Sequence, residues 1–303
     1  MNIRLLAILA GLSTIGIYAL QFVGARFSLT TQGELARLTS TDLTILRIIA
    51  SGLFFLPFLR RRHVRSFLNL GWKRIALLTC LAGAPYPFLI NIGLDFTPAA
   101  HAAAILPSSV VLFSAILGWL AFKTPISRYS SISLMLIGGG MALFVCYDLI
   151  FDPWALPGDM ILFAVGAGFA YFSLTVRELQ IDPLAVTAGI IWCSWPLMVP
   201  MFVAMPSNLF VAAPAEIISQ AIIQGILSGA IALFLTTFAA RHLGSQTASL
   251  FLVGIPIATA ILGAMALGEL PIMLEIVALG LMAIGIGLPA SRFVWHQYKT
   301  AQR

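Results

Sequence analysis

The sequence predicts an all-α integral membrane protein, with ten transmembrane helices arranged as two inverted repeats of five. Its 303 residues are 60% hydrophobic and only 9% charged, with a mean hydropathy of +1.01. Soluble domains carry about 25% charged residues, so a water-soluble globule is excluded. Apolar runs long enough to cross a bilayer recur along the chain. A shift of 145 residues, from 115 to 260, aligns the first half with the second.

The ten helices follow from the length of the apolar runs. A transmembrane helix needs about 20 mostly apolar residues to cross roughly 30 Å of hydrocarbon. Cutting the chain where charges, Pro or Gly interrupt these runs predicts helices over residues 5–24, 43–59, 74–94, 99–122, 130–146, 160–176, 184–205, 217–239, 245–267 and 272–288. The longest outer connection, about 25–42, is polar and has no apolar core of its own.

The basic residues predict the orientation. With alternate connections on opposite sides, one side holds only Arg26, Arg37 and Arg47 of the 17 Lys and Arg residues. Cytoplasmic loops carry the excess of basic residues, so both termini are predicted to be cytoplasmic, in the cell (inner) membrane. The net charge of +6 therefore indicates orientation, and no nucleic-acid partner is expected. The apolar start after Arg4 has no clear Ala-x-Ala site, which favours an uncleaved first helix.

An internal duplication is predicted from the same shift. It places Ala115-Ile-Leu-Gly118 on Ala260-Ile-Leu-Gly263, and Gly140 on Gly285. A polar break near 148–159 separates a predicted first repeat, 1–149, from a second, 150–303. Because five crossings is an odd number, the second repeat enters from the opposite face. Inverted repeats offer two conformations, open to opposite sides, which is the basis of alternating access; duplication for stability alone is the alternative.

Six short motifs in this order and spacing resemble the EamA-type members of the drug/metabolite transporter superfamily. They are Tyr18-Ala-Leu-Gln-Phe-Val-Gly-Ala-Arg26, Leu46-Arg-Ile48, Phe96-Thr-Pro-Ala-Ala-His101, Gly158-Asp159, Phe169-Ala-Tyr171 with Arg177, and Gly268-Glu269. Two positions depart from the family pattern: Tyr18 replaces the commoner Trp, and Thr124 stands where a repeat mate of Glu269 is expected. The resemblance covers nearly the whole chain. It implies a central cavity lined by the first four helices of each half, and export of a small polar metabolite such as an amino acid.

Polar side chains inside the spans are the candidate substrate contacts, because they tend to face a cavity or another helix. The predicted substrate-binding residues are Tyr18, Gln21, Arg47, Tyr86, Asn91, His101, Ser108, Tyr171, Trp192, Thr236 and Gln246. Each also has a structural interpretation: Arg47 pairs with Asp42 or Asp95, for example, and the others pack or hydrogen-bond between helices. Pro107 and Pro256 interrupt their helices near the middle and are predicted hinges or gates.

The motifs that are missing narrow the function. All 11 acidic residues lie in loops or near helix ends, so coupling to protons, where present, is left to His101 or an acid such as Glu269. There is no GxxxxGK[ST], HExxH or GxSxG sequence, so neither ATP-driven pumping nor an enzyme is predicted, and no cofactor or metal is expected. The expected partners are the lipid bilayer and a small-molecule substrate. The leading hypothesis is a secondary transporter; a channel or lipid-moving membrane protein is the alternative, and a membrane-embedded enzyme is less favoured. Direction, coupling ion and oligomeric state stay open.

Overall fold

The computed structural model describes residues 3–30, 37–58, 61–123, 128–179, 183–243 and 245–301. About 89% of the chain is helix, and the described residues form no strand. The predicted all-α class is therefore confirmed. Thr124, one of the two departures from the family pattern, lies outside the described residues.

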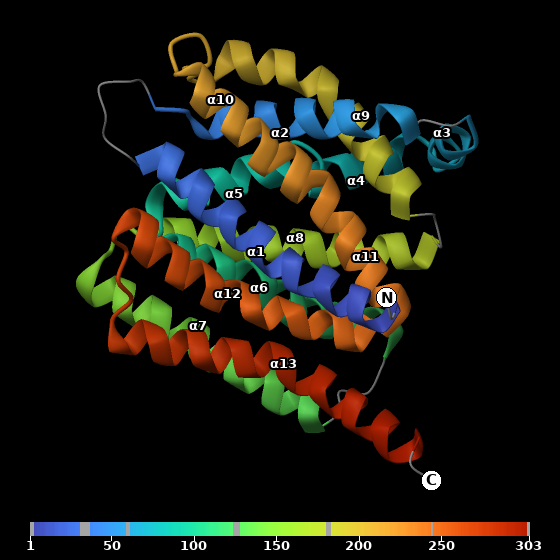
Figure 1. Cartoon of the computed structure of the whole chain (residues 1–303), viewed down its shortest axis with the longest axis vertical. Coiled ribbons are helices and arrows are strands. Elements are labelled where there is room, and N and C mark those ends of the chain that lie inside the picture. The colour runs from blue at the N-terminus through green and yellow to red at the C-terminus, as the bar shows by residue number, and fades with distance from the viewer. Residues whose placement is uncertain are drawn as a thin grey trace.

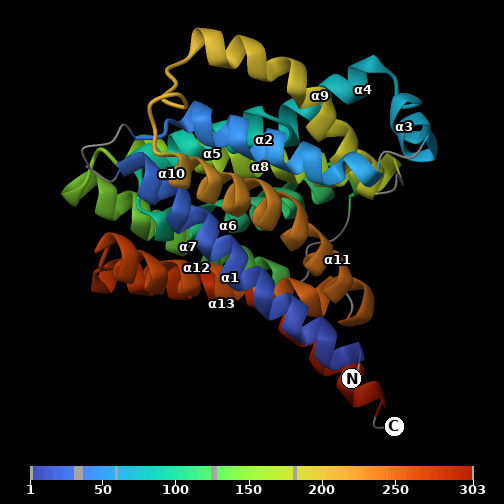
Figure 2. The ribbon, with the colours of Figure 1, turned by 45° about the horizontal axis from the view of Figure 1, so that its top comes forward.

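The helices run back and forth between two ends of the molecule, and both termini lie at the same end (Figures 1 and 2). In chain order they are α1 (Ile3–Thr30), α2 (Ser40–Phe55), the 3₁₀ turn η1 (Leu56–Phe58), α3 (Arg61–Leu68), α4 (Trp72–Ala82), α5 (Pro85–Phe96), α6 (Ala99–Phe122), α7 (Arg128–Phe151), α8 (Leu156–Leu179), α9 (Pro183–Ala204), α10 (Pro214–Gln220), the π-helix η2 (Ala221–Ile231), α11 (Ala232–Leu243), α12 (Ser245–Leu267) and α13 (Met273–Ala301).

Eight helical stretches of the described chain are long and apolar enough to cross a membrane. The predicted spans 43–59 and 272–288 are not among them. The first corresponds to α2, whose 16 residues rise about 24 Å, less than the thickness of the hydrocarbon core. The second corresponds to the apolar start of α13, Met273–Leu288, which is likewise shorter than a full span.

Two predicted helices are broken in the structure. The predicted helix 74–94 is two helices, α4 and α5, because Gly83 leaves helical geometry at φ −82° and ψ −146°. Pro85 then starts α5, where its missing N–H costs no hydrogen bond. The predicted helix 217–239 is α10, η2 and α11 in sequence, with the wider π-helical turn in the middle.

Close glycine contacts hold α7 and α13 side by side along one face of the bundle (Figures 1 and 2). A Cβ on Gly140 would meet Met282 and the carbonyl of Ala278, while one on Gly285 would meet Ile137 and the carbonyl of Ser133. The positions 133, 137 and 140 of α7 plus 145 are 278, 282 and 285 of α13. Each helix therefore packs its glycine against the turn of the other helix that lies at the positions shifted by 145.

A second glycine contact joins η2 to α2. Gly225 and Gly229 leave no room for a Cβ, because they lie directly against Ala50 and Ser51 of α2. The hydroxyl of Ser51 donates a 2.9 Å hydrogen bond to the carbonyl of Gly225. The Gly225-x-x-x-Gly229 motif therefore serves packing within the chain, bringing the second-half helix η2 against the first-half helix α2.

Candidate functional site

A cavity of about 350 Å³ lies in the middle of the bundle. Its walls come from α1, α2, α4, α5, α6, α8, α9, η2, α11 and α12, and none of its lining residues comes from α7 or α13. Most of the lining is apolar. The polar lining residues are Tyr18, Gln21, Arg47, Ser51, Tyr86, Thr187, Ser228 and Thr236.

The polar groups gather around Arg47, which α2 carries into the cavity. Tyr18 of α1 and Tyr86 of α5 are its electrostatic neighbours. Thr236 of α11 lies beside Tyr18, and its own hydroxyl donates to the carbonyl of Ala232 at 2.7 Å. Four helices that are far apart in sequence therefore place hydroxyls and one guanidinium on the same wall.

Arg47 forms no ion pair with any described residue. Arg26 pairs with Glu269, and the ring nitrogens of His101 face Asp159 and Glu275. The pairing of Arg47 with Asp42 or Asp95, the structural alternative from the sequence, does not form. Asp42 caps α2 by accepting from the Thr39 N–H at 2.9 Å, and Asp95 accepts from the Ser40 hydroxyl at 2.7 Å. Arg47 therefore faces the cavity as a cation without a counter-ion among the described residues.

Gln21 adds a second uncompensated group to the same wall. It is only 6% exposed, and its Oε1 atom has no hydrogen-bond partner among the described residues. A buried acceptor without a partner costs free energy, so it stands ready to accept from a ligand. On the remaining walls, Phe169 packs against Tyr86 with ring centroids 5.0 Å apart, which gives the cavity an aromatic side.

Besides His101, four of the predicted substrate contacts lie away from the lining of this cavity. Asn91 is buried and donates to the hydroxyl of Thr44 at 3.3 Å, so it joins α5 to α2. Trp192 stacks on Trp195, with centroids 4.6 Å apart. The other two are Ser108, which is fully buried, and Tyr171, which is 46% exposed. Contact between these four residues and a substrate stays a prediction.

The two predicted hinges differ in position. Pro107 lines the cavity, and the backbone hydrogen bond that it removes belongs to the carbonyl of Ala103, one turn earlier in α6. Pro256 lies inside α12, where it releases the carbonyl of Leu252, itself a lining residue. The side chain of Gln246, another predicted contact, lies outside the described residues.

Several lining residues escape the sequence prediction. Ser51, Ser228 and Thr187 are small hydroxyl residues, which occur so often between packed helices that the sequence does not single them out. Phe169 and Phe172 are apolar, and nothing in an apolar span separates an aromatic cavity wall from ordinary packing. Their spacing of three residues on one helix face was the only available indication.

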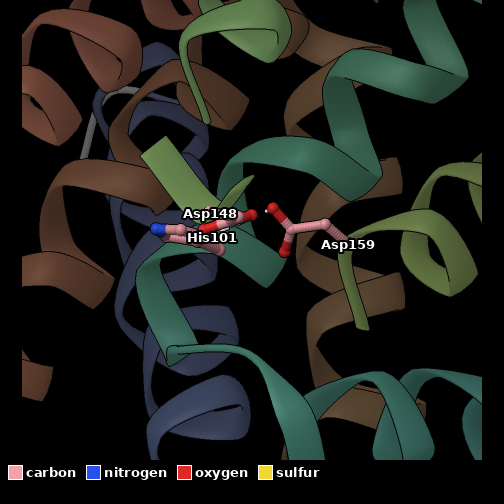
Figure 3. A group of neighbouring side chains, drawn as sticks. All are labelled: His101, Asp148 and Asp159. Carbon is pink, nitrogen blue, oxygen red and sulfur yellow. Dashed lines mark hydrogen bonds and ion pairs between the residues drawn. The ribbon is translucent and has the colours of Figure 1, made fainter. Parts of the chain in front are cut away.

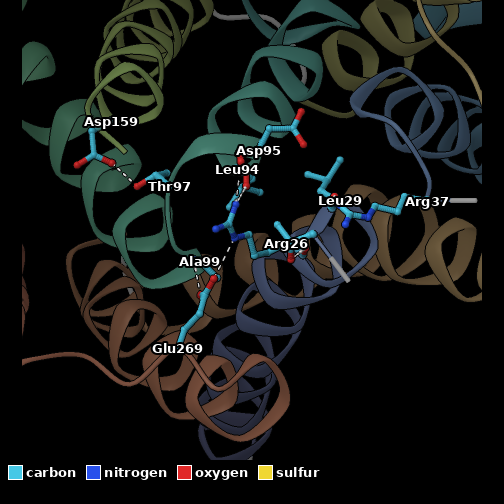
Figure 4. A network of polar contacts seen from close by, with 10 residues as sticks. Arg26, Leu29, Arg37, Leu94, Asp95, Thr97, Ala99, Asp159 and Glu269 are labelled. Atoms are coloured by element: carbon cyan, nitrogen blue, oxygen red, sulfur yellow. Dashed lines mark hydrogen bonds and ion pairs between the residues drawn. The ribbon is translucent and has the colours of Figure 1, made fainter. Parts of the chain in front are cut away.

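A network of polar contacts closes the end of the bundle opposite the termini (Figure 4). The Nε of Arg26 donates to Oε1 of Glu269 at 2.9 Å, and its Nη1 donates to the carbonyl of Leu94 at 2.6 Å. The second carboxylate oxygen of Glu269 accepts from the N–H of Ala99 at 3.0 Å. Glu269 follows Gly268, whose φ of +70° is the left-handed turn that glycine permits. One ion pair thus ties α1 to the α5–α6 and α12–α13 connections.

His101 belongs to this end of the bundle and not to the central cavity. Its Nδ1 lies 3.3 Å from Oδ2 of Asp159, and its Nε2 lies 2.9 Å from Oε1 of Glu275. Asp148 completes the group, with a carboxylate that Figure 3 shows close to the ring and to Asp159. His101 and Glu275 also line a separate cavity of about 160 Å³. The substrate contact predicted for His101 therefore has no support in the central cavity.

These features define a class: a multi-pass helical membrane protein with a central cavity built from both halves of the chain. Residues 5–146 match the sequence model of the EamA-like transporter family, which places this part of the chain in the drug/metabolite transporter superfamily. A solved structure described as "Crystal structure of protein" is similar to it, with a TM-score of 0.63 and 17% identity over 94% of this chain and 97% of that one. At this identity the likeness shows the fold alone. None of the curated proteins compared with the chain matches it in sequence.

Proposed function

We propose that the protein is a secondary transporter that moves a small metabolite bearing a carboxylate, such as an amino acid, by alternating access. The observation that carries this proposal is the central cavity with Arg47 on its wall and no acidic partner. A guanidinium held away from water requires an anion or a dense set of acceptors, and a solute carboxylate supplies the anion. Arg suits this task because its planar fork binds both carboxylate oxygens at once.

The cavity is the right size and character for such a solute. Small-molecule sites have volumes of about 300–1,000 Å³, mostly apolar walls and a few placed polar groups. The volume of about 350 Å³ lies at the small end of that range. In the proposed complex, Arg47 binds the carboxylate, while the hydroxyls of Tyr18, Tyr86 and Thr236 and the free acceptor of Gln21 meet the other polar groups. Phe169 and Phe172 contact the apolar part.

Alternating access is supported by the exchanged contacts of α7 and α13. Gly140 packs on the turn of α13 at Ala278 and Met282, and Gly285 packs on the equivalent turn of α7. Such reciprocity is expected of two inverted repeats, which offer two packings of similar energy open to opposite sides. The cavity draws its walls from both halves, so a rocking of one half against the other changes its access. Pro107 and Pro256 are the proposed hinges, because Pro107 lines the cavity and Pro256 releases the carbonyl of the lining residue Leu252.

The proposed orientation places both termini in the cytoplasm of a cell whose inner membrane holds the protein. Both termini lie at the same end of the bundle, as this orientation requires (Figure 1). The connections at that end carry Lys73, Arg74, Arg128, Arg177 and Arg241, and cytoplasmic loops are enriched in such residues. Export from this side is the proposed direction.

The function is tested with purified protein in two assays. A thermal-shift screen compares amino acids with their amides, and with sugars, nucleobases and hydrophobic cations, because a ligand of the folded state raises the melting temperature. The expected stabiliser carries a carboxylate and loses its effect as the amide. Counterflow of that solute in proteoliposomes then shows whether its flux saturates, as a carrier requires.

The controls separate the possible outcomes. Thr175→Val is the matched control variant, since Thr175 lies outside the cavity lining and should keep full counterflow. Stabilisation by the amide as strongly as by the acid contradicts recognition by Arg47. Flux that rises linearly with solute, without counterflow, indicates a channel, the alternative from the sequence. An imposed pH gradient across the same vesicles tests proton coupling, which stays a prediction.

A further inference from the structure

We propose that His101, Asp148 and Asp159 form a binding site for one divalent metal ion, at the end of the bundle opposite the termini. One donor atom from each residue, Nδ1 or Nε2 of the imidazole and one oxygen of each carboxylate, lies within 4.8 Å of the others. All three side chains are buried, with exposed fractions of 1%, 0% and 3%. The proposal concerns a site outside the central cavity and does not depend on the transported solute.

Asp148 is the first observation that points to a cation. Neither of its carboxylate oxygens has a hydrogen-bond partner among the described residues, although the side chain is fully buried. An ionised carboxylate buried without a partner is strongly unfavourable, and an ionised carboxylate can only accept. Figure 3 shows its oxygens beside His101 and the Asp159 carboxylate, which also only accepts when ionised. A positive ion between the two carboxylates removes the conflict.

The hydrogen bonding of His101 is the second observation. Its Nε2 lies 2.9 Å from Oε1 of Glu275, an ordinary hydrogen-bond length. When a metal ion replaces the proton on Nδ1, the neutral ring keeps its proton on Nε2 and donates it to Glu275. Nδ1 then carries a lone pair, and it faces Oδ2 of Asp159 at 3.3 Å. Two ligands bound to one ion through bonds of about 2.1 Å lie about 3.0–3.4 Å apart when they meet at 90–110°. The spacing of these two acceptors therefore fits a shared metal ion.

The surroundings supply the outer hydrogen bonds that metal sites use. Metal-binding histidines usually donate their second N–H to a carboxylate, which fixes the ring and raises its basicity. Glu275 provides this carboxylate, and it is itself held by the N–H of Ile272 on its other oxygen at 2.7 Å. Thr97 donates to the free oxygen of Asp159 at 2.5 Å. Glu275 and Thr97 are positioning residues in this proposal, because each acts through a ligand.

The donor set indicates the kind of ion. One imidazole and two carboxylates suit Zn²⁺ or Mn²⁺, whereas Ca²⁺ and Mg²⁺ prefer oxygen ligands throughout. Two ionised carboxylates and a neutral imidazole also balance the charge of a divalent ion. A cavity of about 160 Å³ lies beside His101 and Glu275 at this end of the molecule.

The metal would join the two halves of the chain. His101 and Asp148 lie on α6 and α7 of the first half, and Asp159 lies on α8, which opens the second half. Through Glu275 the site also reaches α13. A bound ion therefore fixes four helices relative to one another at this end, which predicts that metal binding raises the thermal stability of the whole protein.

The experiment uses the full-length protein in detergent, stripped with EDTA and dialysed. Zn²⁺ or Mn²⁺ is added alone, bound metal is counted by mass spectrometry after gel filtration, and melting is followed in parallel. We expect one ion per chain and a saturable rise in melting temperature. Asp148→Asn should weaken the affinity at least about 100-fold, and Glu275→Gln about 10-fold to 100-fold. Glu178→Gln is the matched control, because Glu178 lies at the far end of α8 outside the ligand set, and should bind as the wild type does.

Two results would overturn the proposal. One is the absence of stoichiometric metal on the wild-type protein; stabilisation by acidification alone, with no metal bound, has the same meaning and assigns the cluster to protons. The other is equal metal affinity in Asp148→Asn and the wild type. The wild-type stoichiometry decides the first point even where a variant does not fold. Loss of counterflow with an intact metal count would break the proposed transport function and leave the metal site standing.

Discussion

The central cavity and the His101 cluster are opposite in charge, although α6 contributes to both. The cavity has one cation, Arg47, and no carboxylate among its lining residues. The cluster has the carboxylates of Asp148, Asp159 and Glu275 around one imidazole. His101 lies only six positions before Pro107 of the cavity wall on α6, a rise of about 9 Å. On the two proposals, these neighbouring sites of one bundle take ligands of opposite sign.

The two sites also differ in how much they can change. The cavity has room for a ligand. The guanidinium of Arg47 and the Oε1 atom of Gln21 have no ion-pair or hydrogen-bond partner among the described residues, which suits a ligand that enters and leaves. The cluster has almost no exposed surface, and each of its ring nitrogens already faces a carboxylate. This arrangement suits an ion that stays. We therefore propose that the cavity exchanges its ligand, whereas the cluster holds an ion that stabilises the fold.

The largest expected effect is on solute binding in the cavity. Arg47→Gln removes the only cation of the lining and should weaken binding of a carboxylate solute at least about 100-fold, because a charged hydrogen-bonded pair desolvated in a cavity is lost. Arg47→Lys keeps the charge but loses the planar fork, so it should recover only part of the affinity. Isothermal titration of the stabilising solute measures both. Metal affinity should stay within about two-fold of the wild type in each variant. A loss of metal affinity alongside the loss of solute affinity would mean that the two sites are not independent.

The sequence predicted more of the cavity than of the cluster. Tyr18, Gln21, Arg47, Tyr86, Thr236 and Pro107 were all candidates, because a polar side chain or a proline in an apolar run is conspicuous, and all six line the cavity. The acids of the cluster looked like helix-end residues in a polar connection. Only the tertiary fold shows that three connections far apart in sequence bury them around one histidine.

A smaller effect separates affinity from stability at Gln21. Gln21→Leu removes a buried acceptor that has no partner among the described residues. It should therefore raise the free energy of unfolding of the ligand-free protein by about 1 kcal/mol, and its melting temperature with it. The same change should weaken solute binding about ten-fold, since one hydrogen bond is lost. Melting curves with and without solute test both. Asn91→Leu is the contrast, because Asn91 donates to Thr44, and its loss should lower stability without changing solute affinity. A destabilised Gln21→Leu protein would mean that the acceptor is already satisfied.

The next prediction concerns the stability contributed by the ion pair of Arg26 and Glu269, at the end of the bundle that holds the cluster. Glu269→Gln should lower the stability by about 1–2 kcal/mol, because the part-buried pair at 2.9 Å and the cap on Ala99 are both weakened. The double variant Arg26→Gln with Glu269→Gln should cost less than the sum of the single changes, since neither charge is left alone. A thermal-unfolding double-mutant cycle gives the coupling. Additive single effects would show that the pair contributes through its separate backbone contacts.

The breaks within helices show what the hydrophobic pattern of a sequence does not determine. Gly83 and Pro85 were visible in the apolar run 74–94, yet Gly and Pro are common in membrane helices, so a break there had no greater weight than a continuous helix. Close packing at Gly225 and Gly229 was easier to predict, because two glycines four residues apart leave a flat helix face whichever helix packs against it. The partner of that face came only from the structure.

The smallest expected effect concerns the prolines, and it tests whether the cavity changes access while the cluster does not. Pro256→Ala restores an N–H that can bond the carbonyl of Leu252, which straightens α12 beside the cavity. Counterflow should slow by about three-fold to ten-fold while solute affinity stays the same, because the variant favours one of two packings without touching a binding group. Pro200→Ala is the control, since Pro200 also lies inside a helix, α9, but lines neither cavity. Equal slowing in both variants would trace the effect to general helix stiffness, and the hinge would then have to be sought in the packing of α7 on α13.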